Sequence, residues 1–389
     1  MTSLDDLLAP EGWPYASTPS TGRGDPGRFH ALFGRDSLIT SLQVLPERPG
    51  VARATLRALA ALQGRVEDPE TDEEPGRIVH EHWPQAPERL RAAGWPVRDG
   101  ELRYYGSADA TPWFLIVLAA LDDHELSREL DASWRAAGRW LELALERGGG
   151  LLRHGPRRRR GGLKQQGWRD TVDPMKPDTH GGGIVRADGS APRHPLADAD
   201  SQAVAVAGMR ALARLSGEVR HRRAGERLAA LVAERFGPET LAIQGDDSTV
   251  KGAGSQLGWL LWADALPPVA AERAAQRLCR SDVLTPWGLR TLSSEHPQFD
   301  PTAYHRGSVW PFDSWLGFGG LRAAGREKEA EQVRRGVLDA IEALGEAPEL
   351  YAVTDDGPAR IPFANRVQGW TVGARLALEG RWDGRAEAL

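Results

Sequence analysis

The chain has 389 residues, of which 41% are hydrophobic and 26% are charged, and its formal net charge is −5. This length supports a large buried core, and no apolar stretch approaches the roughly 20 residues that a membrane-crossing helix needs. The single cysteine, Cys279, excludes an internal disulfide and a cysteine-based metal cluster, and it is typical of a reducing compartment.

Eleven segments have the composition and the apolar spacing of α-helices. They are rich in Leu, Ala, Arg and Glu, and few β-branched runs interrupt them. In chain order they are residues 34–46, 51–63, 107–121, 127–146, 196–215, 218–236, 252–265, 268–278, 308–324, 326–344 and 368–378. Strand signals are weak throughout. The sequence therefore predicts an all-α protein.

The connections between these helices alternate in length. Short links such as "PERPG" and "SG" make neighbouring helices antiparallel. Long segments rich in glycine and proline separate the resulting pairs, at about residues 63–106, 148–195, 237–253, 279–307 and 345–367. This alternation predicts a ring of helical hairpins, as one domain over residues 1–389, with every long loop at the same end. Six pairs need a twelfth helix, which we expect at "SLDDLL" near the start or at "RAEAL" at the end.

The chain also carries signals about location and partners. It begins "MTSLDDLLAPEGWPY", with acids where a secretory signal would be basic, so we expect a cytoplasmic protein. The only basic run, "GPRRRRGG" at residues 155–162, predicts a solvated loop in an acidic chain rather than a contact with nucleic acid. Neither a P-loop nor a dinucleotide-binding glycine motif precedes a helix. We therefore expect no nucleotide cofactor, nucleic-acid partner or membrane partner.

Unusual polar residues gather where the long loops meet the next helix. Arg35 and Asp36 adjoin each other in the otherwise apolar segment "RFHALFGRDSLITSLQVL", where charges are costly unless they are paired or used. An acid favoured by the helix dipole at a helix start is the simpler interpretation. Similar junctions are "RYYGSADATPWF", "KQQGWRDTVDP", "KGAGSQLGW", "YHRGSVWPFDSW", "PELYAV" and "RVQGWTV". Their convergence predicts a site at the mouth of the ring, with Arg35 and Asp36 in it.

The residues at this mouth favour carbohydrate chemistry. Tryptophan, with 14 copies, outnumbers both phenylalanine and tyrosine, and its wide apolar face stacks on sugar rings; a tryptophan-rich core is the other interpretation. Hydrolysis of a glycosidic bond needs a carboxylic acid and a carboxylate, and the acid works best in apolar surroundings. Asp170 beside Trp168 fits the acid, with Asp173 as a competitor, and Glu349 fits the second carboxylate. A surface carboxylate or a helix cap is the alternative for each.

Other motifs give weaker signals. "IVHEHW" holds His80 and His82 around Glu81, and strand-like alternation would place both histidines on one face. We interpret the motif either as a sugar contact or as a structural element. No H-x-x-x-H or H-E-x-x-H spacing is present, so no zinc site is expected. A serine nucleophile lacks its G-x-S-x-G motif.

Five blocks resemble, in order, those of the bacterial amylo-α-1,6-glucosidase, or glycogen-debranching-related, family of glycoside hydrolases. They are "FGRDSLIT", "YYGSADATPWF", "QGWRD", "GLRTLSS" and "YHRGSVWPFD", and the similarity runs from about residue 15 to residue 374. The resemblance implies a six-hairpin (α/α)6 barrel and inverting hydrolysis of α-glucosidic bonds. It also implies a carbohydrate substrate, and neither a cofactor nor a metal is expected.

The same resemblance implies roles for individual residues. Asp170 in "GWRD" matches the general acid, and Glu349 in "PELY" matches the general base. Arg35 and Asp36 match a pair that clamps sugar hydroxyls. The other expected substrate contacts are Tyr105, Asp109, Trp168, Arg169, Gln202, His305, Arg306, Trp310 and Trp370. In an inverting enzyme the two carboxyl groups stand roughly 6.5–9.5 Å apart, which leaves room for a water molecule.

Alternatives remain open at this point. Barrels of this size also resemble hydrolases of small compatible solutes such as glucosylglycerate or mannosylglycerate, and "PFANRVQGW" differs from the debranching pattern. A sugar epimerase with the same barrel would need a pair of histidines for proton transfer. A non-catalytic glycan-binding barrel would keep the tryptophans and show no turnover. The oligomeric state is left open.

Overall fold

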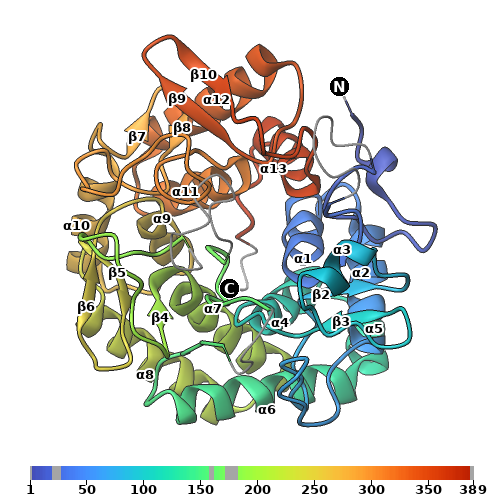
Figure 1. Ribbon diagram of the computed structural model, residues 1–389. Helices are drawn as coiled ribbons and strands as arrows, with labels where there is room; N and C mark the ends of the chain where they lie inside the picture. The colour runs from blue at the N-terminus through green and yellow to red at the C-terminus, as the bar shows by residue number, and fades with distance from the viewer. Residues whose placement is uncertain (1, 20–27, 157–161, 171–182, 386–389) are drawn as a thin grey trace.

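Six helices that are buried on most sides surround a common axis. The computed structural model describes residues 2–19, 28–156, 162–170 and 183–385. Within them, a helix such as α4 is buried from Ala110 to Ala119, because its sequence is apolar on every face. These inner helices are α1 (Gly34–Gln43), α4 (Ala110–Leu121), α7 (Ala199–Ser216), α9 (Gln256–Trp262), α11 (Pro311–Ala323) and α13 (Gly369–Glu379), and Figure 1 shows them as a ring.

An outer layer of amphipathic helices covers this ring. In α8 the buried residues are His221, Gly225, Leu228 and Val232, a single stripe at helical spacing that faces α7. The outer helices are α2 (Pro49–Ala61), α6 (Asp131–Arg147), α8 (Val219–Arg235), α10 (Pro268–Leu278) and α12 (Glu327–Leu344). Each follows an inner helix, through a short link in every case except α6, which the short helix α5 separates from α4. The (α/α)6 barrel is therefore confirmed. The predicted helix 127–146 is interrupted, because α5 (His124–Glu129) ends at Leu130, where α6 starts.

Two inner helices approach each other closely because each has a glycine at the crossing. A Cβ atom on Gly258 of α9 would lie 2.6 Å from the Cα of Gly317 of α11, so a side chain there would push the helices apart. The pair forms part of the wall on which the long loops rest.

The long loops fold into small antiparallel sheets that the sequence did not predict, because their strands have only two to four residues. The first sheet has the order β1–β2–β3, and Glu81 of β2 lies opposite Phe33 of β1 and Tyr104 of β3. The first-sheet strands are β1 (Leu32–Phe33), β2 (Glu81–Trp83) and β3 (Leu102–Tyr104), with the short α3 (Glu88–Ala92) between the last two. The others are β4 (Ala197–Asp198), β5 (Thr240–Ile243), β6 (Thr249–Lys251), β7 (Leu284–Thr285), β8 (Gly288–Leu289), β9 (Tyr351–Thr354) and β10 (Gly357–Arg360).

The N-terminal segment packs where the outer partner of α13 would lie. Leu4 and Leu7 form an apolar cluster with Val51 of α2 and Val372 of α13. This segment forms only one 3-10 turn (Asp5–Leu7) rather than the α-helix considered for "SLDDLL". The other candidate for a twelfth helix, "RAEAL", lies almost entirely outside the described residues.

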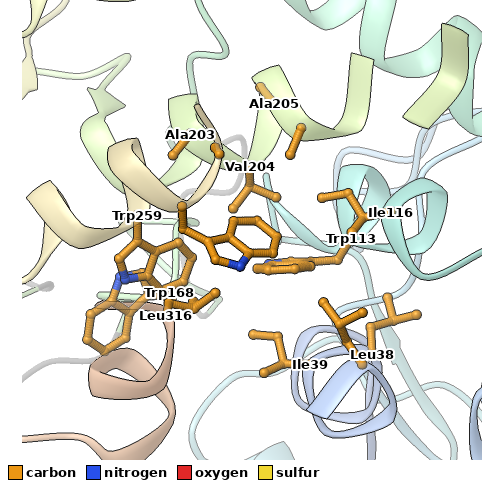
Figure 2. Close-up of a cluster of buried hydrophobic side chains, with 14 of the residues drawn as sticks. Leu38, Ile39, Trp113, Ile116, Trp168, Ala203, Val204, Ala205, Trp259 and Leu316 are labelled. Carbon is orange, nitrogen blue, oxygen red and sulfur yellow. The ribbon is translucent and has the colours of Figure 1, made fainter. Parts of the chain in front are cut away.

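Aromatic side chains fill the barrel axis (Figure 2). The indole rings of Trp168 and Trp259 stack with their centroids 5.8 Å apart, and Trp113 meets Trp259 edge-on at 6.2 Å. Aliphatic side chains from α1 and α7, including Ile39 and Val204, pack around them. These tryptophans therefore belong to the core, which is one of the two interpretations of the high tryptophan content. In the part of the chain that the structure describes, we find no helix with the length and hydropathy of a membrane span.

Replacing Leu7 with alanine tests whether the N-terminal turn is part of the barrel. Leu7 is fully buried, so Leu7→Ala is expected to lower the free energy of unfolding by about 2–5 kcal/mol. Chemical denaturation measures this change. Leu143→Ala on α6, where the side chain is 54% exposed, is the control and should cost much less. Equal losses would show that Leu7 is not packed in the core.

Candidate active site

A cavity of about 720 Å³ opens among the long loops. Its wall combines residues that are far apart in the sequence, from Arg28 to Trp370. The lining residues are Arg28, Phe29, Phe33, Arg35, Asp36, His80, Glu81, Arg89, Leu90, Ala93, Trp95, Gly162, Leu163, Lys164, Trp168, Asp170, Tyr304, His305, Trp310, Glu349, Gln368 and Trp370. The predicted junctions at residues 103–114 and 251–259 contribute no side chain to this wall.

Arg35 is a buried cation at the centre of the site. Its place depends on Gly34, where a Cβ atom would lie 2.1 Å from the carbonyl oxygen of Val79, so only glycine lets α1 begin against that segment. The guanidinium donates from Nε to both carboxylate oxygens of Asp109 at 2.9 Å, and from Nη1 to Oδ2 of Asp170 at 2.7 Å. Burial alone would lower the pKa of Arg35, but the two carboxylates outweigh it and raise the pKa above its ordinary value. Arg35 therefore stays charged.

Asp36, the next residue of α1, favours its neutral form, whereas Arg35 favours its charged form. It is buried and lines the cavity, and its Oδ2 accepts a hydrogen bond from Nε2 of Gln368 at 3.2 Å. Burial raises the pKa of Asp36 to about 8; Arg35 opposes this rise, whereas the charges of Asp170 and Glu349 add to it. Asp36 therefore carries a proton at neutral pH and can donate a hydrogen bond into the cavity.

Glu349 is held by hydrogen bonds on both oxygens. The hydroxyl of Tyr304 donates to Oε1, and the backbone N–H of Asn365 donates to Oε2 at 3.1 Å. The side-chain amide of Asn365 in turn donates to Gln368, which contacts Asp36, so one network joins the two carboxyl groups. Burial raises the pKa of Glu349, and the two hydrogen bonds oppose that rise.

Asp170 reaches the same cavity from another loop. Its side chain is 12% exposed, whereas that of its partner Arg35 is 2% exposed. The charge of Asp170 contributes to the raised pKa of Glu349, so the two carboxyl groups are within electrostatic reach of each other. Both groups therefore meet in one cavity, and the separation of roughly 6.5–9.5 Å stays a prediction.

Aromatic rings form much of the remaining wall. The His305 ring stacks on Trp310 with centroids 5.1 Å apart, and Trp370 stacks on Phe312 at 3.9 Å. Neither ring nitrogen of His305 has a hydrogen-bond partner among the described residues. Burial, together with the charges of Arg169 and Arg35, lowers the pKa of His305 well below its usual value. The imidazole is therefore neutral and suited to hydrogen-bonding a ligand hydroxyl.

The structure does not bring five of the expected substrate contacts to the cavity wall. Their polar groups are satisfied inside the protein instead, so they hold the loops that carry the site. The Tyr105 hydroxyl donates to the carbonyl of Leu62 at 2.8 Å, and the side-chain amide of Gln202 hydrogen-bonds to both backbone groups of Leu152. Asp109 binds Arg35, and Arg169 binds Asp200 at 3.0 Å. Arg306 is buried but does not line the cavity.

The sequence does not predict that Tyr304 and Gln368 line the cavity. They lie within "YHRGSVWPFDSW" and "RVQGWTV", but nothing in the sequence shows that their side chains contact carboxylates. Asp173 and four arginines of the basic run, residues 157–160, lie outside the described residues.

The two histidines of "IVHEHW" do not share one environment, so the expectation that they lie on one face is wrong. His80 lines the cavity, whereas His82 binds Glu101 at 2.8 Å and is absent from the lining. The physical reason is that β2 begins only at Glu81, so strand alternation does not extend back to His80.

Within residues 2–19, 28–156, 162–170 and 183–385, no group of three His, Cys, Asp or Glu side chains is close enough together to hold a metal ion.

The fold is an (α/α)6 barrel with a cavity that carboxyl groups line. Residues 168–371 match the model of the mannosylglycerate hydrolase MGH1-like glycoside hydrolase domain, and the chain belongs to this family. It is therefore a glycoside hydrolase. The family match does not single out amylo-α-1,6-glucosidases, so the resemblance is confirmed only as far as a glycoside hydrolase family.

Solved structures share the fold at low sequence identity. The GH63 mannosylglycerate hydrolase from Thermus thermophilus, crystallised with Tris and D-glycerate, superimposes with a TM-score of 0.71 at 15% identity, over 97% of this chain and 98% of that one. The same enzyme crystallised with glucose gives a TM-score of 0.68 at 15% identity, over 97% of each chain. A wild-type glycosidase gives 0.58 at 13% identity, over 98% of this chain and 95% of the other. No curated protein matches the sequence.

The raised pKa of Asp36 makes stability depend on pH. Between about pH 4 and pH 8 the folded state keeps a proton on Asp36 that the unfolded state has lost, so the free energy of unfolding falls as pH rises. Asp36→Asn, whose amide oxygen can still accept from Gln368, should remove this part of the decrease. Chemical denaturation across this range measures it, with the exposed Asp131→Asn as the control. Parallel pH profiles for wild type and Asp36→Asn would contradict the assignment.

Proposed function

We propose that this protein hydrolyses an α-glycosidic bond with inversion, using Asp170 as the general acid and Glu349 as the general base. The observation that carries the proposal is that these two carboxyl groups, from loops far apart in the sequence, line one cavity together with Arg35 and Asp36. Because the lining residues run from Arg28 to Trp370, we also propose that residues 1–389 act as one catalytic domain.

In this mechanism Glu349 takes a proton from a water molecule whose oxygen bonds to the anomeric carbon. The bond from that carbon to the leaving oxygen breaks, and Asp170 supplies the proton that the leaving oxygen needs. Tyr304 and the N–H of Asn365 orient Glu349 and favour its ionised form. The protonated Asp36 donates a hydrogen bond to a sugar hydroxyl.

The contact between Arg35 and Asp170 opposes protonation of the acid. The mechanism therefore requires a bound sugar to replace the contact between Nη1 of Arg35 and Oδ2 of Asp170, after which the burial of Asp170 favours the protonated carboxyl. Arg35 can make this exchange without leaving the site, because its Nε remains bound to Asp109.

We propose a small glycoside with a carboxylate on its leaving group, such as mannosylglycerate or glucosylglycerate, as the substrate. Besides Arg35, the cationic side chains Arg28, Arg89 and Lys164 line the cavity and are complementary to such an anion. The family match and the D-glycerate bound by the Thermus thermophilus enzyme support the same choice. An epimerase is disfavoured, because the cavity histidines His80 and His305 both have pKa values lowered by burial and are poor bases at neutral pH.

Removing either carboxyl group should nearly abolish turnover. Asp170→Asn and Glu349→Gln are each expected to lower kcat by about 10²–10⁴-fold, because each removes one proton transfer from the transition state. Asp131→Asn, on the outer helix α6, is the control and should leave kcat unchanged. Proton NMR of the first product formed from an α-glycoside should show the β anomer. Net retention would contradict the inverting mechanism.

A substrate panel separates the two substrate classes. The value of kcat/KM should be highest for mannosylglycerate or glucosylglycerate. It should be lower by at least about tenfold, or 1.4 kcal/mol, for isomaltose, panose and glycogen limit dextrin, because these substrates carry no negative charge that the cavity cations could bind. Initial rates of sugar release measure this. The reverse order would support a debranching activity instead.

A further inference from the structure

Glu81 is a cavity carboxyl group that the proposed mechanism does not use. It belongs to "IVHEHW" and lies on β2, the central strand of the first sheet. Its side chain is 4% exposed and lines the cavity. The indole N–H of Trp83 donates to Oε2 at 2.8 Å, which fixes the carboxyl group. No hydrogen bond from a described residue reaches Oε1, and no described cation lies within ion-pair distance of it.

We place Glu81 on the leaving-group side of the cavity, because it lines the same cavity as Asp170, the proposed acid, and the charge of Asp170 acts on it. In an inverting reaction the water and the leaving group lie on opposite faces of the sugar, so the leaving group lies on the side of the acid. Glu81 is close enough to Asp170 for the charge of that residue to act on it. Its backbone belongs to a different segment from the one that carries Glu349. The first sheet packs with Leu90, Trp95 and Leu163, which line the cavity beside Glu81.

The charges around Glu81 set its proton affinity. Burial raises the pKa of Glu81 to about 7; the Trp83 hydrogen bond and Arg89 oppose the rise, and Asp170 adds to it. Among the other facing groups, Phe33 on β1 carries no charge, Tyr104 on β3 has a raised pKa, and His80 has a pKa far below its usual value. Arg28, Arg35, Asp36 and Lys164 line the same cavity.

We propose that Glu81 determines which leaving groups the enzyme accepts: its protonated carboxyl donates a hydrogen bond to a carboxylate of the leaving group, and its ionised form repels that carboxylate. This inference rests on the proposed function. Ionisation of Glu81 does not repel a neutral leaving group. A hydroxyl of such a group accepts a hydrogen bond from the protonated carboxyl and donates one to the carboxylate. Glu81 is thus a specificity-determining residue, and the selection it makes depends on pH.

A matched pair of substrates tests this assignment. The same sugar is linked to glycerate, which is anionic at every pH used, or to glycerol, which is neutral. For the wild type, the ratio of kcat/KM for the glycerate over the glycerol glycoside should fall about tenfold between pH 6 and pH 8, following the loss of the Glu81 proton. Asp36 is expected to contact the sugar in both glycosides, so its titration cancels in this ratio.

The Glu81→Gln variant keeps a donor that does not titrate, so its ratio should stay constant between pH 6 and pH 8. Glu88→Gln, on the exposed face of α3, is the control and should behave as the wild type does. A ratio that falls equally in Glu81→Gln and in the wild type would overturn the role of Glu81.

A binding measurement with D-glycerate tests the role of Glu81 without depending on hydrolysis. Isothermal titration with D-glycerate alone should give a Kd that rises about tenfold from pH 6 to pH 8 in the wild type and stays constant in Glu81→Gln. This result would support Glu81 even if neither glycoside were hydrolysed, an outcome that would reject the proposed function. Absence of D-glycerate binding, or identical pH profiles in both proteins, would overturn the inference.

Discussion

The ion pairs of Arg35 are the constraint on which the site depends. A buried guanidinium without partners would cost several kcal/mol, so Asp109 and Asp170 must both be near it. Asp109 stands just before α4, Asp170 lies in the loop that precedes α7, and Arg35 lies in the first turn of α1. The requirement to neutralise one cation therefore brings three distant parts of the chain together and places a carboxyl group at the cavity.

Among the described residues, four carboxyl groups line the cavity, and their surroundings give them different protonation states. Asp170 is paired with a cation, Glu349 receives two hydrogen bonds, and Asp36 and Glu81 are buried with pKa values of about 8 and 7. Four negative charges in one cavity would repel one another strongly, and protonating two of them relieves that repulsion. Carboxyl groups whose environments separate their pKa values can take different roles at one pH, as donors, acids or bases.

The barrel and its loops contribute different parts of this cavity. The inner helices supply aromatic side chains such as Trp259, and Trp168, from the loop before α7, stacks on Trp259 and also lines the cavity wall. The loops supply nearly all the polar groups, and small sheets such as β1–β2–β3 hold these loops in place. The buried residues Arg169, Gln202 and Tyr105 bind backbone or side-chain groups of neighbouring segments, so their polar atoms stabilise the loops rather than contact the cavity.

The sequence by itself determined the helices, their pairing into a barrel and the segments that surround its mouth, because apolar spacing and link length are local properties. The resemblance of its motifs to a known family predicted that Arg35, Asp36, Asp170 and Glu349 belong to one site, and all four line the cavity. Only the tertiary structure decided that Tyr105 and Gln202 turn away from the cavity and that Glu81 turns into it. Those orientations depend on which backbone groups and charges come near from other loops, and no local pattern encodes such contacts.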